Sequence, residues 1–339
     1  MGDDGSMLTE REKIILKAVV EEYINTGEPI SSKVVMSKYC PYVSSATVRN
    51  DMGVLEEMGY ITQPHPSAGR IPSPKGYKYY VENLLDDCKL SPQQRMRIRK
   101  ILSGLESEIR DLREMIRTTS WLIAQLSKLL AFSYGPISSG RHIKKLWLTP
   151  VNGESVLLVY MTNVGEVNHK VISAKYNQYN LERLSNIFSS KLENEDMDRL
   201  DINEIVTLLP EEEPLIKEVF EHLRREKYTT AESYIEGTDY IDKIPEFNNP
   251  EILKNLISII NKEDLVMEQI NAAISSGDVW TSIGEKGELT FIVVPYFMED
   301  FPIGGAGVVG PVRMNYKYII PLLNYLKNCI SDMLSVRWR

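Results

Sequence analysis

Residues 43–70, VSSATVRNDMGVLEEMGYITQPHPSAGR, decide how the first part of this 339-residue chain is organised. Ser44 or Ser45 can cap a helix, which would run to Gly59, a residue type that ends helices in the left-handed conformation. A strand over 60–63, a basic loop over 64–70 and a second strand from Ile71 follow. The stretch therefore predicts a helix and a two-stranded hairpin.

Two further helices are predicted upstream of this stretch. Thr9 and Glu12 have the spacing of a capping box, which starts a helix that stops at Thr26-Gly27. A shorter helix runs over 32–39, before Pro41 breaks the pattern. Three helices followed by a hairpin with a basic loop are typical of a winged helix-turn-helix.

This arrangement places small polar side chains, one Arg and one Asn at the start of the third helix, and such side chains contact base edges. Residues 29–81 hold six Lys or Arg and three Asp or Glu, a local +3 in a chain of net charge −8. Arg49 is the preferred base contact; the competing interpretation is an ion pair with Asp51 or Glu56. The basic loop can lie along the DNA backbone or enter a minor groove, with Arg70 as the expected probe. The candidate DNA-binding residues are Ser44, Ser45, Thr47, Arg49, Asn50, His65, Ser67, Gly69, Arg70 and Lys75.

The remainder of the chain alternates between helical and strand patterns. One long helix is expected over 92–132 and a linker over 133–140. Residues 191–251 carry eighteen acids and seven bases, a local −11 that repels DNA. The other predicted strands are 143–150, 155–161, 167–174 (an antiparallel meander), 279–283, 289–296 and 307–309, and the other predicted helices are 181–192, 202–209, 214–225, 250–260, 264–275 and 316–334.

Several classes of protein find no support in the sequence. An apolar run of about 18 residues, as a membrane span requires, is missing, so a cytoplasmic protein is expected. The three cysteines and four histidines are scattered, which predicts neither a disulfide nor a metal site. Acids 211–213 are expected to be a solvated helix cap. A GxGxxG match at 305–310 precedes Pro311 rather than a helix, and we expect no cofactor, no catalytic residues and no enzyme.

Four motifs carry a resemblance to a known family: residues 43–52, 56–65, 67–72 and GPVRMNY at 310–316. In this order they resemble the HrcA family, bacterial heat-inducible transcription repressors of chaperone genes, from about residue 8 to 334. The resemblance implies a homodimer that binds an inverted-repeat operator in double-stranded DNA, with a chaperonin modulating its activity.

The resemblance also implies an α+β, multidomain fold. Residues 1–6 would be a disordered N-terminus or the remnant of a tag, and 7–82 the winged helix-turn-helix DNA-binding domain. A GAF-like α/β domain would comprise 90–142 and 229–339, with an antiparallel sheet and helices at 143–228 as the inserted dimerisation domain.

Two hypotheses remain for how such a repressor is switched. In the first, heat lowers the folded or DNA-competent fraction and the chaperonin restores it, which a marginal stability of about 5–15 kcal/mol permits. In the alternative, the chain is a ligand-sensing winged-helix regulator whose GAF-like domain binds a metabolite in a cavity lined by Phe291, Val293 and Tyr296. Packing within the core competes with the cavity as the role of these three residues.

Overall fold

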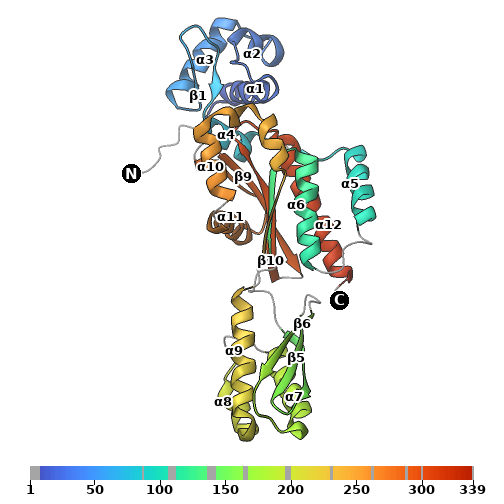
Figure 1. Cartoon of the computed structure of the whole chain (residues 1–339). Helices are drawn as coiled ribbons and strands as arrows, with labels where there is room; N and C mark the ends of the chain where they lie inside the picture. Colours follow the sequence, from blue (N-terminus) through green and yellow to red (C-terminus); the bar gives the residue numbers. More distant parts are fainter. Residues whose placement is uncertain are drawn as a thin grey trace.

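The computed structural model describes residues 8–85, 88–105, 112–135, 143–162, 167–194, 200–229, 232–260, 263–286, 289–298 and 301–337. The expectations for residues 1–6 and for 136–140 of the linker lie outside these described residues. Figure 1 shows three parts in a row: N-terminal helices at one end, a sheet flanked by helices in the middle, and a smaller sheet with helices at the other end. We call them the head (8–85), the central part, and the distal part (143–229).

The head contains the three predicted helices and the predicted hairpin. The Thr9–Glu12 capping box is present, and Gly27 ends the first helix at φ 71°. Ser31 and Ser44 cap the next two helices. The two antiparallel strands are only two residues long each, and a helix follows them. The elements are α1 (Glu10–Thr26), α2 (Ser32–Tyr39), α3 (Ser45–Glu57), β1 (Ile61–Thr62), β2 (Ile71–Pro72), α4 (Pro74–Tyr79) and the π-helical turn η1 (Tyr80–Leu84).

The central part is built on a five-stranded antiparallel sheet in the order β7-β3-β10-β9-β8. Two pairs of helices cover its faces: α6 and α12 share one apolar cluster with it, and α10 and α11 share another. The strands are β3 (Leu130–Gly135), β7 (Glu232–Glu236), β8 (Trp280–Lys286), β9 (Leu289–Met298) and β10 (Phe301–Pro311). The helices are α5 (Pro92–Leu105), α6 (Leu112–Ser127), α10 (Pro250–Ile260), α11 (Glu263–Ser276) and α12 (Tyr316–Arg337), with short 3-10 turns η5 (Thr238–Lys243) and η6 (Pro245–Asn248).

The prediction of a single helix over 92–132 is wrong, because the described residues there form two helices, α5 and α6 (Figure 1), and a strand at the end. Lys128 adopts φ 60°, which stops α6. The following apolar residues form β3, which pairs with β7 and β10 and is buried on both faces by the helices that cover the sheet. The sequence of a strand that is buried on both faces is a continuous apolar run. Periodicity alone cannot distinguish such a run from part of a buried helix. Residues 133–135 of the expected linker belong to the same strand.

The prediction of a metabolite cavity is also wrong, because its three lining residues do not lie on one face of the sheet. Successive side chains of a strand point to opposite faces. Phe291 and Val293 pack in the cluster beneath α10 and α11, whereas Tyr296 packs in the cluster beneath α6 and α12. All three side chains are fully buried. Since the sheet separates them, they cannot line one cavity.

The GxGxxG match lies inside β10, which is hydrogen-bonded to β3 on one side and β9 on the other. A Cβ atom on Gly307 would lie 2.3 Å from the carbonyl oxygen of Ile292. The glycine thus permits a close approach of two strands. This agrees with the expectation that the motif is structural.

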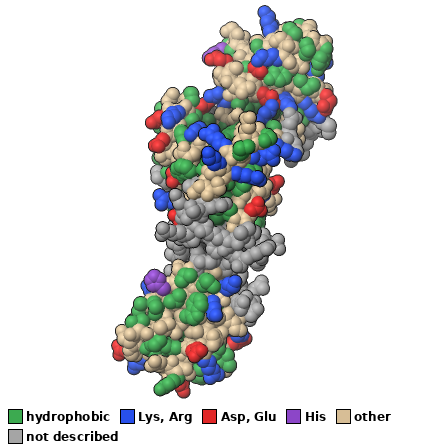
Figure 2. All heavy atoms as spheres, turned by 90° about the vertical axis from the view of Figure 1, so that its right-hand side faces the viewer, with side chains coloured by type: hydrophobic (Ala, Val, Ile, Leu, Met, Phe, Trp, Pro, Cys, Tyr) green, Lys and Arg blue, Asp and Glu red, His purple; other side chains and the backbone are tan. Residues whose placement is uncertain are grey.

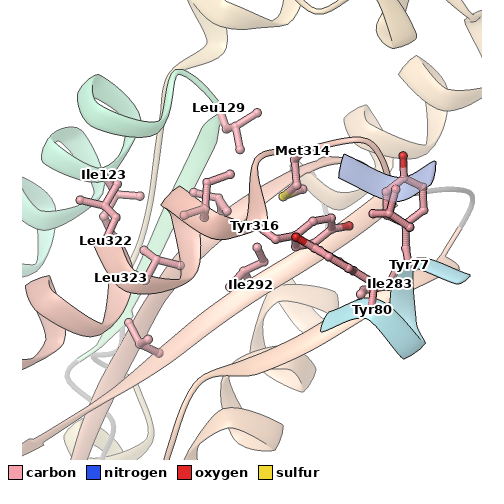
Figure 3. Packing of buried hydrophobic residues seen from close by; sticks show 14 of the residues in the cluster. Tyr77, Tyr80, Ile123, Leu129, Ile283, Ile292, Met314, Tyr316, Leu322 and Leu323 are labelled. Carbon is pink, nitrogen blue, oxygen red and sulfur yellow. The ribbon is translucent and has the colours of Figure 1, made fainter. Parts of the chain in front are cut away.

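One apolar cluster runs from the head into the central part without a break (Figure 3). Tyr77 of α4 and Tyr316 of α12 meet with their ring centroids 6.0 Å apart. Ile283 of β8 and Ile292 of β9 lie beside them in the same cluster. The orientation of the head in this structure is therefore fixed by packing as well as by the chain connection.

The distal part contains the predicted meander β4-β5-β6 and has its own apolar cluster. Ser185 and Ser189 accept hydrogen bonds from the backbone N–H groups of Leu148 and Leu146, so α7 covers the open edge of β4. The elements are β4 (Ile143–Asn152), β5 (Ser155–Thr162), β6 (Val167–Ser173), α7 (Leu181–Asn194), α8 (Ile202–Leu208) and α9 (Glu213–Thr229), with 3-10 turns η3 (Gln178–Asn180) and η4 (Pro210–Glu212).

The acids at 211–213 are not uniformly a solvated cap. Glu212 is 1% exposed, and its carboxylate accepts hydrogen bonds from the Asn177 N–H at 3.0 Å and the Asn180 amide at 2.9 Å. Its neighbour Glu213 begins α9, where a negative charge suits the helix dipole. The middle acid therefore has a structural role that the sequence pattern did not indicate.

Candidate nucleic-acid interface

The N-terminal end of α3 is fixed by its serines. Ser44 Oγ accepts the N–H of Thr47 at 3.1 Å and lies 2.9 Å from the Thr47 hydroxyl. Ser45 Oγ lies 3.0 Å from Ser32 Oγ on α2. The contact between Ser32 and Ser45 joins the two helices where the chain turns between them. Ser44 and Ser45 thus have internal partners, whereas Arg49 and Asn50 on the same helix are exposed.

The opposite face of α3 is anchored to α1. Val48, Met52 and Leu55 are buried on this face. Asp51 is buried with them and receives two hydrogen bonds from Arg11, at 2.7 Å from Nε and 3.0 Å from Nη2. The hydrogen bond and the charge of Asp51 raise the pKa of the Arg11 guanidinium. This two-pronged pair sets the rotation of α3, and so decides which residues face solvent.

A second charged contact joins α1 to α2. Glu22, which is 8% exposed, accepts hydrogen bonds from Lys38 at 2.7 Å and from the Tyr39 hydroxyl at 2.9 Å. The bond from Lys38 lowers the pKa of Glu22 despite its burial. Burial and the bond to Glu22 raise the pKa of Tyr39 to about 12. The relative placement of α1 and α2 therefore depends on an ionised carboxylate.

The competing interpretation of Arg49, an ion pair on the surface of α3, is wrong. Asp51 is bound by Arg11, and Glu56 is bound by Arg70 at 2.9 Å. Among the residues that the structure describes, Arg49 has no ion-pair partner. Its guanidinium is thus exposed without a neutralising acid.

The loop after β1 is held in shape by one amide. Gln63 Nε2 donates to the carbonyl oxygens of Pro66 and Ala68, both at 2.9 Å. At the base of the loop, Ile30 and Arg70 exchange two backbone hydrogen bonds of 2.8 Å. His65 and Ser67 at the tip are exposed. The base of the loop is therefore held by backbone hydrogen bonds, and its short polar tip is exposed.

A groove of about 480 Å³ lies between this loop and the start of α2 and α3. It brings together Arg49, Ser67, Gly69 and Arg70 of the predicted residues. Its lining includes two residues that the sequence analysis did not select, Lys33 and Gln63, of which Lys33 could have been found from its place in the first turn of α2. Of the other predicted residues, Ser44, Ser45, Thr47, Asn50, His65 and Lys75 are not part of the lining.

Lys75 is a residue of α4, and its side chain lies at the C-terminal end of α3. Its ammonium donates to the carbonyl oxygen of Met58 at 3.0 Å and lies 4.6 Å from the centroid of the Tyr60 ring. A cation at this position complements the negative end of the helix dipole. The side chain is exposed, but its ammonium caps the helix end instead of facing the groove.

Cations also gather outside the head. Arg95, Arg97, Arg99 and Lys100 of α5 are all exposed, and the described residues of that helix include no acid. Figure 2 shows Lys and Arg side chains collected over the face of the molecule on which α5 lies. The central part therefore has a basic surface, although the net charge of the whole chain is −8.

In the described parts of the chain, no group of three or more His, Cys, Asp or Glu side chains is placed to hold a metal ion. Cys40, Cys88 and Cys329 are free thiols. None of the helices in these parts combines the length and the apolar character needed to cross a bilayer.

Comparison with known proteins places the chain in a family. The family model described as HrcA protein C terminal domain matches residues 113–320. The chain belongs to the HrcA family. It is 32% identical to the heat-inducible transcription repressor HrcA of Acetivibrio thermocellus, with 96% of each chain covered. The HrcA repressor of Desulforamulus reducens is also 32% identical, with 97% of each chain covered.

A crystal structure described as that of a hypothetical protein shares the fold of this HrcA chain. The TM-score is 0.60 at 23% identity, with 97% of this chain and 98% of the other covered. The likeness extends over all three parts of the molecule. Membership of the HrcA family thus rests on the sequence comparisons, and the arrangement of the elements is shared with a solved structure.

Proposed function

We propose that this chain represses transcription of heat-shock chaperone operons by binding their DNA, and that it has no catalytic activity. Its relatives are named heat-inducible transcription repressors. The observation that carries the proposal is the exposed Arg49 on α3, unpaired among the described residues, beside a groove that also contains Lys33. An exposed guanidinium on such a helix can bond to guanine O6 and N7 in the major groove.

In this proposal the head is a winged helix-turn-helix. Its helix α3 would enter the major groove, with Arg49, Thr47 and Asn50 toward base edges. The groove between α3 and the loop would follow the sugar-phosphate backbone, where Lys33 is a further phosphate contact. The remaining proposed DNA contacts are Ser44, Ser45, His65, Ser67, Gly69 and Lys75, and Arg70 lies at the base of the loop that carries three of them.

We propose that the central part, residues 90–142 and 229–339, is a GAF-like domain and that 143–228 is an inserted dimerisation domain. The outward face of the distal sheet supports this role. Trp147, Val159 and His169 form one row across the three strands, and Leu157 and Val171 lie in the next. Trp147 is 39% exposed and Val171 52%. An apolar sheet face of this kind is stabilised when a second copy covers it.

A dimer suits an inverted-repeat operator in double-stranded DNA, because each head would bind one half-site. We propose that heat lowers the DNA-competent fraction and that a chaperonin modulates it. The metabolite-sensing alternative loses the cavity on which it was based, since the sheet separates its three residues.

Fluorescence anisotropy on the inverted repeat of a chaperone-operon promoter tests the proposal. We expect tight binding that depends on dimer concentration, at least about a thousandfold stronger than binding to a scrambled duplex. A chaperonin added to the protein would increase the active fraction. Equal affinity for both duplexes would contradict the proposed function.

A further inference from the structure

The loop of the head is joined to α3 by one ion pair that crosses the groove. Arg70 Nη2 lies 2.9 Å from Glu56 Oε2, in the last turn of α3. The side chains are 19% and 34% exposed, so this pair is partly shielded from water. Such pairs interact more strongly than those on an open surface. We call this contact the Glu56–Arg70 clasp.

The backbone next to the clasp allows little adjustment. Gly69 lies so close to Ile30 that a Cβ atom on it would be 2.5 Å from the Ile30 carbonyl carbon and oxygen. Arg70 itself exchanges two backbone hydrogen bonds with Ile30. The base of the loop is therefore seated on the connection between α1 and α2, and the Arg70 side chain then extends toward α3.

The environment of the guanidinium argues against a free DNA-probing role. Its charge is balanced by Glu56, and its Nε is buried and has no hydrogen-bond partner among the described residues. The Glu56 carboxylate would lie beside any phosphate that approached this guanidinium, and the two anions would repel each other. Binding a phosphate here would therefore cost free energy.

We infer that Arg70 is a positioning residue, which with Glu56 holds the loop at a fixed distance from α3 so that both engage DNA as one rigid surface. This inference rests on the proposed function, because it concerns how the same surface is presented. Direct contacts then fall to the exposed tip, His65 and Ser67, and to Arg49. A preorganised surface binds more tightly because less ordering is required on association.

Two neutral variants, Glu56→Gln and Arg70→Gln, separate positioning from phosphate contact. If Arg70 positions the loop, both variants lower operator affinity by about fivefold, since each removes the same interaction. Their salt slopes stay alike. If Arg70 binds a phosphate, Glu56→Gln leaves affinity unchanged or raises it, whereas Arg70→Gln reduces the salt slope by about one. That second pattern would overturn the inference.

A double variant, Glu56→Arg with Arg70→Glu, exchanges the two charges and tests whether restoring the ion pair restores operator affinity. We call it the exchange variant. Restoring the pair in reverse should return affinity to within about twofold of the unmodified protein if the clasp positions the loop. A loss greater than that of Arg70→Gln would mean that a cation at position 70 is needed for DNA itself. Glu57→Gln, an exposed neighbour on α3, is the matched control and should change affinity by less than about twofold.

Hydrogen exchange on the free protein provides a readout without DNA. The amides of Ile30, Ala68 and Arg70, which donate the backbone hydrogen bonds of the loop and its base, should exchange faster in both single variants and regain protection in the exchange variant. Unchanged exchange would overturn the positioning role. Failure of the unmodified protein to prefer the operator would contradict the proposed function while leaving the exchange result interpretable, so the two failures are distinguishable.

Discussion

Arg313 and Ile24, separated by 289 residues in the chain, are joined by a hydrogen bond of 3.2 Å from the guanidinium Nη1 to the carbonyl oxygen. Ile24 lies in the last turn of α1, where carbonyls lack partners within the helix. That turn has no basic residue of its own. Glu246 holds the other side of the guanidinium at 2.5 Å. Arg313 thus caps a helix of the head from the central part.

The first prediction concerns this junction. Arg313→Met should lower the free energy of unfolding by about 1–2 kcal/mol, because it leaves the Ile24 carbonyl and Glu246 without their partner. Glu246→Gln should have a similar but smaller effect, and the double variant should lose less than the sum. Urea denaturation of the three proteins measures this coupling. Strictly additive losses would show that the two residues act separately.

A matched control exists for the loss of a surface cation. Lys217 is 60% exposed and lies 2.6 Å from Glu213, which is 47% exposed. Lys217→Met should therefore change stability by less than about 0.5 kcal/mol. Hydrogen exchange in residues 20–27 should increase in Arg313→Met and stay unchanged in this control, since the affected carbonyl belongs to α1.

Local patterns predicted much of the head, and tertiary contacts explain what they missed. Thr9 and Glu12 form contacts with each other, and Gly27 ends the same helix, so each acts on nearby residues. Their roles could therefore be predicted from spacing. The pairs Arg11–Asp51 and Glu56–Arg70 join residues that no local rule connects. These pairs decide which arginine in the candidate interface remains exposed.

The central sheet was harder to predict for a related reason. The residues of β3 form a short apolar run after a helix, and only pairing with β7 and β10 makes it a strand. β7 itself is five residues long and follows shortly after the end of a helix, α9. The distal meander alternates between buried and exposed positions along β5, which is why its strands were predicted correctly.

The second prediction tests the base contact. Arg49→Gln should weaken operator binding by about 1–3 kcal/mol and leave binding to scrambled DNA nearly unchanged, because a bidentate contact to guanine discriminates between bases. Anisotropy titrations on both duplexes measure the difference. Arg97→Gln removes an exposed arginine from α5 and is the control for charge alone. Equal losses on both duplexes for Arg49→Gln would contradict a base-reading role.

The third prediction contrasts two glycines of the head. Gly69→Ala should lower stability by about 1–3 kcal/mol and weaken operator binding, because its Cβ atom would meet the Ile30 backbone at 2.5 Å. Gly53 lies inside α3 with open space around its Cβ position. Gly53→Ala should raise stability by about 0.5–1 kcal/mol through helix propensity. Thermal unfolding of both variants measures the opposite signs, and a neutral Gly69→Ala would show that the loop can shift freely.

The fourth prediction concerns pH and Glu22. Because the folded state holds the pKa of Glu22 below its ordinary value of 4.5, its contribution to stability is complete above that pH and is lost as the pH falls below it. Glu22→Gln should thus cost about 1 kcal/mol at neutral pH, and the difference from the unmodified protein should shrink as the pH falls below 4.5. Urea denaturation across this range measures it. A difference that stays constant with pH would mean that the ionised form of Glu22 is not responsible.

The last prediction concerns the distal sheet as an interface between two copies. Trp147 pairs across the sheet with Val159, and its ring is 39% exposed on the face opposite the apolar cluster. Trp147→Thr keeps a residue type that suits strands but removes the large apolar surface, so it should shift a dimer toward monomers without unfolding the sheet. Sedimentation velocity at several concentrations measures the shift, and operator affinity should fall with it because two half-sites are no longer bound together. Tyr179→Ser is the control, since Tyr179 is 93% exposed but lies on η3, outside the sheet. If Trp147→Thr dimerises as strongly as the unmodified protein, the contact between copies must lie on another surface.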